Sequence, residues 1–321
     1  MKGSAISGGG ARQPAVAGAV YGSLASLIWA GFPAVTKLAM ASQTLTAWDV
    51  TALRFGAGGL ILVPLFARLR LGKLEAWQAL LLACGAGAPY VLLTAGGLAF
   101  APAGHMGVLT PSCMLLTSTL GGALLLRERL SPGRLSGVLA IFGGILMLGW
   151  DGLANHGELT WLGDLMFVTG GLFWASYTLM SRALAVDALH ATAVVAVLSM
   201  VLYLPGYAWL AGGSLAAAPW REIAIQVVFQ GLLSAVVALL LYTRAVAILG
   251  AARGAVFAAL VPSFSLLIAI PTLHELPTRL QLVGVGFVTI GMLLALGISS
   301  RGPSGRASPN SAVCRTSKGR S

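Results

Sequence analysis

Apolar residues in this chain come in long, nearly unbroken runs rather than in an alternating pattern. A helix that crosses the hydrocarbon core of a bilayer needs about 20 mostly apolar residues. Strands of a membrane β-barrel would instead alternate over segments of about ten residues. The runs therefore predict an all-α polytopic membrane protein with ten transmembrane helices. They cover residues 15–40, 48–66, 76–98, 104–126, 133–150, 161–183, 190–211, 222–245, 252–272 and 279–299.

Polar and turn-forming residues lie between the runs and at both ends of the chain. The first run is too long for a secretory signal peptide and has no clear cleavage site after it. The two ends are rich in Gly, Ser, Pro and Arg, a composition that predicts disordered tails. The expected organisation is a tail at 1–14, helical units at 15–150 and 160–299, and a basic tail at 300–321.

The composition agrees with a membrane location. Of the 321 residues 57% are apolar and only 9% are charged, and the mean hydropathy is +0.88. A soluble domain is usually about one quarter charged. A soluble protein with a large apolar core is therefore excluded as the main interpretation.

The net charge of +11 is distributed unevenly over the predicted loops. With the N-terminus in the cytoplasm, the cytoplasmic segments hold 16 of the 20 Lys and Arg residues. The outer segments hold three, and one remains inside a helix. An excess of basic residues on the cytoplasmic side is typical of membrane proteins. The chain is thus predicted to have both termini in the cytoplasm and to bind lipid headgroups rather than nucleic acid.

Two stretches of the chain repeat the same phrase. WAGFPAVTK at 29–37 and WASYTLMSR at 174–182 share a Trp-Ala start, and each ends in a hydroxyl residue followed by a cation. Later, Glu128, Gly137 and Gly144 match Glu275, Gly284 and Gly291 at an offset of 147 residues, whereas the Trp residues match at 145. Such spaced matches at nearly one offset predict a duplicated five-helix unit.

An odd number of helices in each copy has a topological consequence. The second copy must begin on the opposite side of the membrane, so the two five-helix repeats are expected to be inverted. Inverted repeats are found in many secondary transporters, whose substrate site lies near the midplane between the repeats. The duplication therefore predicts alternating access between two similar packings.

The doubled motifs resemble the EamA-domain family of the drug/metabolite transporter superfamily. The resemblance covers about 15–299 and depends on the Trp-Ala start and the Glu…Gly…Gly close of each half. It implies a carrier of the inner (cytoplasmic) membrane that exports amino acids or related metabolites. One departure concerns proline: Pro262 stands 13 residues before Glu275, but the matching position in the first half is Leu115, and the proline is at Pro111.

Aromatic residues and prolines in the repeated segments are the first candidates for the substrate path. Trp29 and Trp174 form a matched pair, which predicts either membrane anchors or residues on both sides of the path. Tyr177 shares a helix face with Trp174. Proline frees the carbonyl four residues before it, so a kink or a hinge is expected. The candidates with these properties are Trp29, Pro33, Tyr90, Trp174, Tyr177 and Pro262.

Three cations are candidates for gating or charge recognition. Arg54 lies inside the second run, where an arginine costs about 2.5–3.5 kcal/mol on insertion scales. It is predicted to extend to the interface, to pair with an outer acid such as Asp49, or to bind a substrate carboxylate. Lys37 and Arg182 end the repeated phrases and suit the C-terminal dipole of their helices. Helix capping is the main interpretation for both, and their repetition keeps a gating role as the alternative.

His105 and Arg253 occupy neighbouring positions of the two copies. Histidine changes charge between about pH 5 and 8. The two residues are predicted either to be polar helix-end residues or to face opposite mouths of one path. The acids Asp49, Glu128, Asp164 and Glu275 all map to helix ends, which argues against a proton relay through buried carboxylates and leaves the energy source open.

Other classes of function receive little support from the sequence. The three cysteines have no zinc or disulfide spacing, no nucleotide-binding loop is present, and no nucleophile–base motif occurs. We expect no metal, no cofactor and no enzymatic activity, with a small-molecule substrate and the lipid bilayer as partners and a homodimer as a further option. The alternatives to a transporter are a membrane-embedded enzyme and a non-transporting membrane subunit.

Overall fold

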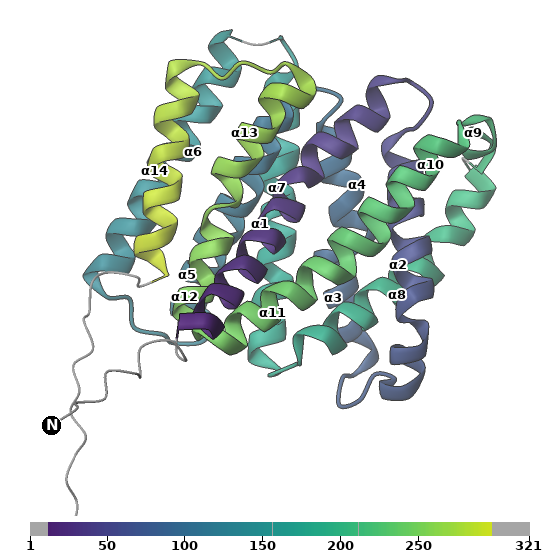
Figure 1. Cartoon of the computed structure of the whole chain (residues 1–321), viewed down its shortest axis with the longest axis horizontal. Helices are drawn as coiled ribbons and strands as arrows, with labels where there is room; N and C mark the ends of the chain where they lie inside the picture. Colours follow the sequence, from purple (N-terminus) through teal and green to yellow (C-terminus); the bar gives the residue numbers. More distant parts are fainter. Residues whose placement is uncertain (1–11, 156, 211, 297–321) are drawn as a thin grey trace, which may run out of the picture.

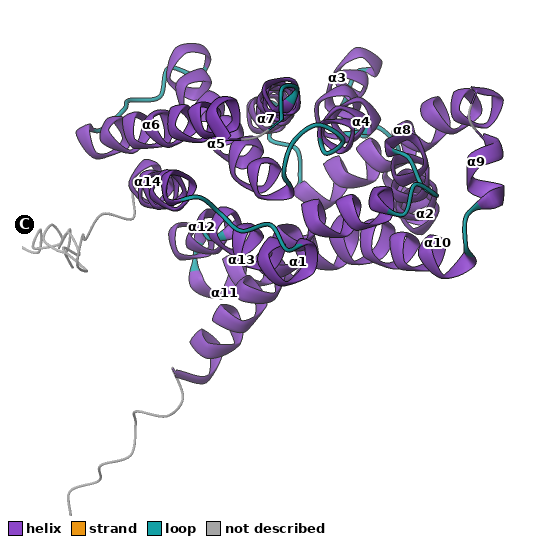
Figure 2. Cartoon of the chain, turned by 90° about the horizontal axis from the view of Figure 1, so that it is seen from above, coloured by secondary structure: helices purple, strands orange, loops and turns teal. Residues whose placement is uncertain are grey.

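The structure is a computed structural model that describes residues 12–155, 157–210 and 212–296. Within these residues all regular secondary structure is helical, as Figure 2 shows. The predicted tails therefore lie almost wholly outside the described part, and only residues 12–14 of the first tail belong to a helix.

The helices of the first half follow one another through short connections. They are α1 (Arg12–Ala41), α2 (Ala47–Leu69), α3 (Ala76–Ala86), α4 (Ala88–Gly97), α5 (Ala103–Leu125) and α6 (Pro132–Asn155).

The second half contains longer helices that are broken into shorter pieces. They are α7 (Thr160–Ala183), α8 (Ala188–Leu210), α9 (Gly212–Ala217), α10 (Trp220–Gln226), the π-helix η1 (Val227–Val237), α11 (Ala238–Leu249), α12 (Ala251–Ala259), α13 (Val261–Leu273) and α14 (Arg279–Ala295).

The helices form a bundle with two ends, which we name from Figure 1. At the upper end α1, α6 and α13 finish and α5, α7 and α14 begin. At the lower end α1 begins, α5, α7 and α14 finish, and α6 begins. The described N-terminal and C-terminal helix ends are therefore both at the lower end.

Eight helical segments in the described part are long and apolar enough to cross a membrane. They include α3 with α4 and α10 with η1 and α11, each taken as one continuous segment. The two remaining predicted runs correspond to α7 and α14. Helix α7 is 24 residues long but contains Asp164 and many small polar residues. Helix α14 is apolar but only 17 residues long. The protein is an all-helical, multi-pass membrane protein.

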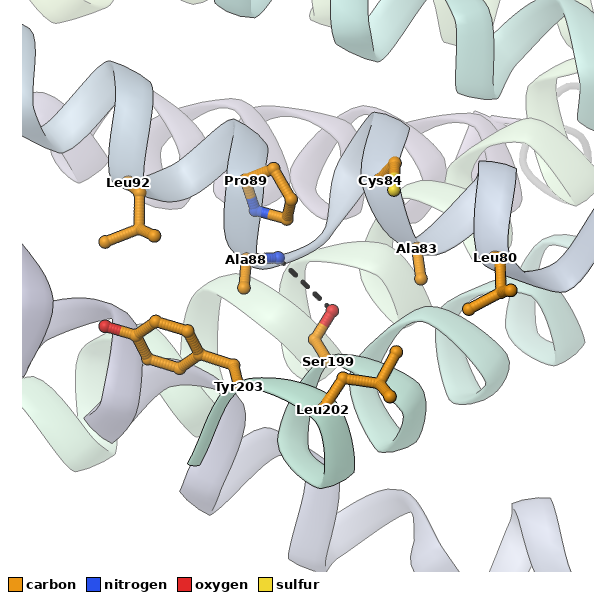
Figure 3. A pocket seen from close by; sticks show the side chains of 9 residues that line it. All are labelled: Leu80, Ala83, Cys84, Ala88, Pro89, Leu92, Ser199, Leu202 and Tyr203. Atoms are coloured by element: carbon orange, nitrogen blue, oxygen red, sulfur yellow. Dashed lines mark hydrogen bonds between the residues drawn. The ribbon is translucent and has the colours of Figure 1, made fainter. Parts of the chain in front are cut away.

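The third predicted run is interrupted at Gly87. A side chain at this position would lie 2.1 Å from both the Ala83 carbonyl oxygen and the Ser199 hydroxyl, so only glycine fits. The Ser199 hydroxyl of α8 accepts a hydrogen bond from the Ala88 backbone N–H at 3.2 Å (Figure 3). A buried backbone donor needs such a partner where a helix is interrupted.

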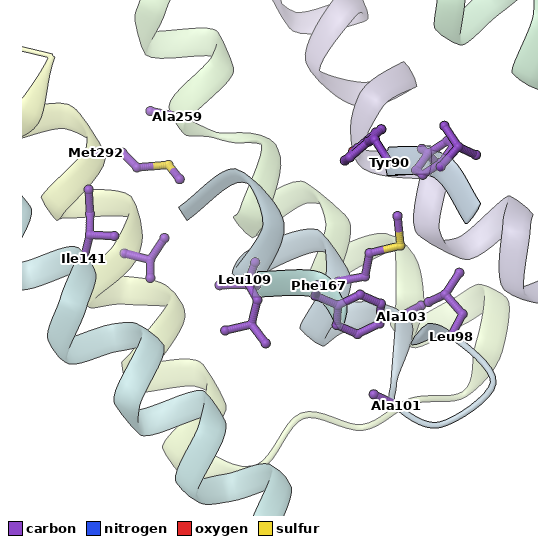
Figure 4. Close-up of a cluster of buried hydrophobic side chains, with 14 of the residues drawn as sticks. Tyr90, Leu98, Ala101, Ala103, Leu109, Ile141, Phe167, Ala259 and Met292 are labelled. Carbon is purple, nitrogen blue, oxygen red and sulfur yellow. The ribbon is translucent and has the colours of Figure 1, made fainter. Parts of the chain in front are cut away.

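The core is one large apolar cluster that connects both halves. Figure 4 shows Leu109 of α5, Ile141 of α6, Phe167 of α7 and Met292 of α14 among its members, and Phe167 and Ile141 are completely buried. Small residues bring helices close together elsewhere. The side of α1 that carries Gly18 and Gly22 packs against Leu249 and Phe257, as the four-residue spacing of small residues predicts.

Glycines hold α6 and α14 in contact along their length. A Cβ atom on Gly137 would lie 2.6 Å from the Gly291 carbonyl oxygen, and one on Gly144 would lie 2.7 Å from the Gly284 carbonyl oxygen. The residue numbers rise on one helix as they fall on the other, so the two helices run antiparallel. Backbones can approach this closely only where side chains are absent.

Gly144→Ala is expected to lower the stability of the bundle by about 1–3 kcal/mol, the usual range for overpacking a tight contact. Gly143→Ala is the matched control, because nothing lies within 4 Å of its added methyl group. Thermal unfolding of both variants in detergent measures the difference. Equal melting temperatures would show that α6 and α14 do not depend on this contact.

Candidate substrate cavity

A cavity of about 310 Å³ lies between helices of both halves of the chain. Its wall is aromatic and apolar, with a few hydroxyl groups and one cation. It is lined by Trp29, Phe32, Pro33, Arg54, Tyr90, Met106, Gly107, Thr110, Pro111, Met114, Trp174, Thr178, Ser234, Tyr242, Ala258 and Val261.

Five of the residues singled out in the sequence meet in this cavity. They are Trp29 and Pro33 from α1, Arg54 from α2, Tyr90 from α4 and Trp174 from α7. Tyr177 does not line the cavity, but its ring centre lies 6.3 Å from that of Trp174 in an edge-to-face arrangement. Trp29 and Trp174, which are 145 positions apart in the sequence, thus line the same cavity.

The two tryptophans each contact a tyrosine from the other half of the chain. The Trp29 and Tyr242 ring centres are 5.3 Å apart, and those of Tyr90 and Trp174 are 4.7 Å apart in an edge-to-face arrangement. Trp29 Nε1 also donates to the Ser234 carbonyl oxygen at 3.4 Å. Aromatic pairs at these distances fix the ring orientations, so the wall of the cavity is defined by rigid side chains.

Arg54 is the only charged residue among those that line the cavity. Its Nη1 atom donates to Gln230 Oε1 at 3.1 Å and to Ser234 Oγ at 3.2 Å, and its guanidinium lies 5.0 Å from the centre of the Phe32 ring. Within the described ranges Arg54 has no carboxylate close enough for an ion pair.

The acid that the sequence offered as a partner for Arg54 has other partners. Asp49 accepts hydrogen bonds from the backbone and hydroxyl of Thr46, both at 2.7 Å, and from the Tyr207 hydroxyl. Asp49 is completely buried at the start of α2, where it forms a capping box with Thr46. The arginine therefore faces the cavity with a positive charge that neutral groups hold in place.

Lys37 lies at the upper end of the bundle and outside the cavity. Its Nζ atom is 3.0 Å from Glu275 Oε1 and donates to the Ala101 carbonyl oxygen at 2.9 Å. Glu275 also accepts the backbone N–H groups of Ala103 and Gly104 at the start of α5, at 3.1 and 3.2 Å. This ion pair joins the end of α1 to the α13–α14 connection and to α5.

Arg182 forms a second ion pair at the lower end of the bundle. Its guanidinium donates to the carboxylate of Glu128, which lies in the α5–α6 connection. Both side chains are partly exposed, as are those of the Lys37 pair. Each repeated phrase therefore ends in a cation that pairs with an acid of the other half.

His105, Arg253 and Pro262 do not line the cavity. His105 is buried at the start of α5, where Nδ1 lies 2.8 Å from Asp164 Oδ1 and Nε2 lies 2.7 Å from Gln281 Nε2. Arg253 is exposed near the start of α12. Pro262 is buried at the start of α13, next to the lining residue Val261, where α12 ends.

Comparison with known proteins identifies the class of this molecule. The EamA-like transporter family model matches two regions, residues 16–150 and 161–297, which together make up most of the chain. The chain belongs to the EamA-like transporter family. The two matched regions agree with the two units that the repeated sequence motifs predict.

Two further likenesses support this assignment. An uncharacterized transporter of Archaeoglobus fulgidus is 25% identical over 273 residues, which cover 84% of this chain and 93% of that protein. A protein of known crystal structure shares the fold with a TM-score of 0.56 and 20% identity, over 89% of this chain and 99% of the other. This EamA-like protein is therefore a multi-pass membrane transporter.

Several residues of the cavity were not found from the sequence. Gln230 and Ser234, which hold Arg54, are polar residues four positions apart within the apolar run VVFQGLLSAVV. Both are buried on one side of η1, so buried polar spacing was a usable signal. Tyr242 and Phe32 carry no such signal, because each is one of many large apolar or aromatic residues in the predicted helices.

The described part of this EamA-like transporter contains no group of three or more His, Cys, Asp or Glu side chains that could hold a metal ion. A second pocket of about 200 Å³ lies beside the break between α3 and α4 (Figure 3). Its lining is almost wholly apolar and includes Cys84 and Leu202, which are exposed on the side of the bundle. The aromatic cavity around Arg54 is therefore the stronger candidate for the substrate site.

Proposed function

We propose that this protein is a secondary transporter that exports amino acids or related carboxylate-bearing metabolites across the inner (cytoplasmic) membrane. The observation that carries the substrate class is Arg54, a half-buried cation without an ion-pair partner in the described part, which faces an aromatic cavity. Export is the direction that the family resemblance implies.

The size and chemistry of the cavity support this substrate class. A volume of about 310 Å³ is at the lower end of the range for small-molecule sites. An arginine fork matches a carboxylate geometrically and electrically. Trp29, Tyr90 and Trp174 supply faces for an apolar or aromatic side chain. A purely cationic substrate would be repelled by Arg54, and no acidic residue lines the cavity to act as its counter-ion.

Contacts that exchange between the halves support an inverted pair of repeats. Gly137 faces Gly291, and Gly144 faces Gly284. The sequence matches Gly137 with Gly284 and Gly144 with Gly291, so exchanging the two halves turns one contact into the other. An antiparallel contact that maps onto itself in this way is what a two-fold axis in the membrane plane would produce.

The ion pairs and the aromatic pairs follow the same rule. Exchange of the halves turns Lys37–Glu275 into Arg182–Glu128, one pair at each end of the bundle. Each tryptophan of the repeated phrase likewise contacts a tyrosine on the third helical segment of the opposite half. We infer that the ion pairs close the two ends of one path in turn, and that the cavity alternates between them.

The proposed membrane arrangement has ten spans with both termini in the cytoplasm. It adds α7 and α14 to the eight apolar segments, because both lie in the same bundle between them. The lower end then faces the cytoplasm, where the basic loop residues gather. The upper end, with Lys37 and Glu275, faces outward.

Cysteine accessibility tests this orientation. We expect Glu158→Cys, in the α6–α7 connection, to react with a membrane-impermeant reagent from outside the cell, and Lys73→Cys, before α3, to react only after permeabilisation. Both positions are exposed, and the background lacks the native residues Cys84, Cys113 and Cys314. The reverse labelling would contradict the orientation and the inverted repeats together.

Counterflow in proteoliposomes tests the transport function. Vesicles loaded with unlabelled phenylalanine should take up labelled phenylalanine faster than protein-free vesicles, and excess carboxylate competitors should suppress this uptake. A transporter gives saturable exchange without consuming the substrate, whereas an enzyme would change it chemically. Uptake equal to that of protein-free vesicles for every amino acid tested would contradict the proposed transport function.

A further inference from the structure

A buried polar cluster at the upper end is separate from the substrate cavity. His105 of α5 has only 1% of its surface exposed, and Asp164 of α7 and Gln281 of α14 are also buried. None of these three side chains lines the cavity. We propose that Gln281, His105 and Asp164 form a proton-binding site, and that proton binding there is linked to opening of the upper end.

Hydrogen-bond directions define the protonation state of His105 in this arrangement. The Thr278 backbone N–H donates to Gln281 Oε1 at 3.2 Å, which orients the amide group. The amide nitrogen of Gln281 therefore points at His105 Nε2, 2.7 Å away, and donates to it. A neutral imidazole has one donor and one acceptor nitrogen. Nδ1 is thus the protonated nitrogen and donates to Asp164 Oδ1 at 2.8 Å.

A second proton on His105 would break this arrangement at one point. It would add to Nε2 and place two donors, Nε2–H and the Gln281 amide, directly opposite each other. Gln281 would have to turn away and give up the Thr278 N–H. That bond belongs to the capping box at the start of α14, in which Thr278 Oγ1 accepts the Gln281 backbone N–H at 3.1 Å.

Asp164 is positioned to stabilise the protonated form. Its Oδ1 atom already accepts from the imidazole, and its Oδ2 atom is buried without a hydrogen-bond partner in the described structure. Gly152 places no side chain against this oxygen, because a Cβ atom there would lie 2.5 Å from it. A buried carboxylate beside a histidine favours its charged form, so the site holds a proton acceptor and its counter-ion together.

Other charged groups of the described residues also adjoin the cluster. Asp151 of α6 accepts from Thr278 Oγ1 at 2.6 Å, and Glu275 accepts from the two residues before His105. Lys37 of α1 pairs with Glu275. Charged or titratable residues that are exposed at this end of the bundle include Glu158, His274 and Arg279.

The link to opening follows from what the capping box supports. Thr278 joins α14 to Asp151 of α6, and Glu275, three residues earlier, holds both Lys37 and the start of α5. Releasing Gln281 loosens the connection that keeps these elements together. Protonation is therefore expected to favour the state in which the upper end is open, where His105 also becomes accessible to water.

Histidine carbon NMR tests the site without any substrate. The protein in detergent, labelled with ¹³C at histidine Cε1, has four histidines, and the signal that His105→Gln removes belongs to this site. We expect that signal to change position as the pH is varied, because proton binding adds a charge to the imidazole. Gln281→Glu, which offers an acceptor to Nε2, and Asp164→Asn, which removes the neighbouring carboxylate, should each change the pH dependence of this signal.

The control for this experiment is His274→Asn. His274 lies exposed at the same end with a positive φ of 55°, which asparagine tolerates. This variant should leave the His105 titration unchanged. A His105 signal that stays constant from pH 5 to 8, or that does not move in Gln281→Glu and Asp164→Asn, would show a fixed interhelical hydrogen bond and overturn the proposal.

Coupling of this proton to transport rests on the proposed function and has its own test. With one pH unit across the membrane, one coupled proton sustains up to about tenfold accumulation of labelled phenylalanine. His105→Gln should retain counterflow at equal pH and lose this accumulation, whereas His274→Asn should retain both. Accumulation that persists in His105→Gln overturns the coupling. Absence of counterflow in the wild type instead overturns the proposed function, and the titration alone then decides on the site.

Discussion

Replacing Arg54 by glutamine is expected to weaken substrate binding by about tenfold or more and to leave the bundle folded. A hydrogen bond to a charged group contributes about 1.5–3 kcal/mol, and each 1.4 kcal/mol is a factor of ten in affinity. Glutamine can still reach toward Gln230 and Ser234, the neutral partners of the guanidinium. The concentration dependence of phenylalanine counterflow measures the effect as a higher half-saturation concentration.

Two variants show whether this loss belongs to the cavity. Arg68→Gln removes a cation from the exposed end of the same helix and should keep wild-type affinity. Arg54→Lys keeps the charge but loses the planar fork, so an intermediate affinity is expected. Wild-type affinity in Arg54→Gln, with normal melting, would assign the guanidinium a structural role and remove the main support for a carboxylate substrate.

The course of the helices could be predicted from the sequence because membrane spans are a local property. Runs of apolar residues predict the α1, α2, α5, α6 and α8 spans within a few residues. The repeated positions Gly137 and Gly284 indicated the glycine contact between α6 and α14. Repetition also led to Trp29 and Trp174, since residues that match between two copies occupy related places.

The surroundings of charged residues could not be predicted, because they depend on partners distant in the chain. For Arg54, six residues after Trp48, the sequence left open an interface position, an acid partner and a substrate carboxylate. In the structure Gln230, 176 residues away, holds it beside the cavity. The position of Asp164 near a helix end was interpreted as evidence against a buried carboxylate. Instead the beginnings of α5, α7 and α14 converge at the upper end, and the carboxylate is buried against His105.

His105 and Arg253 show why a repeat does not guarantee equal roles. They occupy neighbouring positions of the two copies, yet one is buried and the other exposed. The first half has the continuous helix α5 here, whereas the second half is divided into α12 and α13 at Leu260, just before Pro262. The proline of the first half is Pro111, whereas Pro262 of the second half matches position 115. This difference in proline position therefore changes where the helix breaks and the environment of nearby side chains.

Reversing the charge of Lys37 is expected to shift the transporter toward the state that is open at its upper end. Lys37→Glu places a carboxylate beside Glu275, so attraction becomes repulsion. For partly exposed pairs each effect is about 0.2–1 kcal/mol, and their sum changes the ratio of the two states by about twofold to thirtyfold. Thr178→Cys in a cysteine-free background lines the cavity and reports the open side by labelling with an impermeant reagent.

The opposite shift is expected from Arg182→Glu, which breaks the pair at the lower end and should increase labelling of the same cavity cysteine from the cytoplasmic side. The double variants should differ in a way that the contacts explain. Arg182→Glu with Glu128→Arg restores an ion pair and should recover the wild-type ratio. Lys37→Glu with Glu275→Lys should recover it only in part, because Glu275 also accepts two backbone N–H groups at the start of α5, where a cation is unfavourable. A wild-type ratio of labelling from the two sides in both Lys37→Glu and Arg182→Glu would contradict alternating closure by these pairs, since each reversal then leaves the balance between the two open states unchanged.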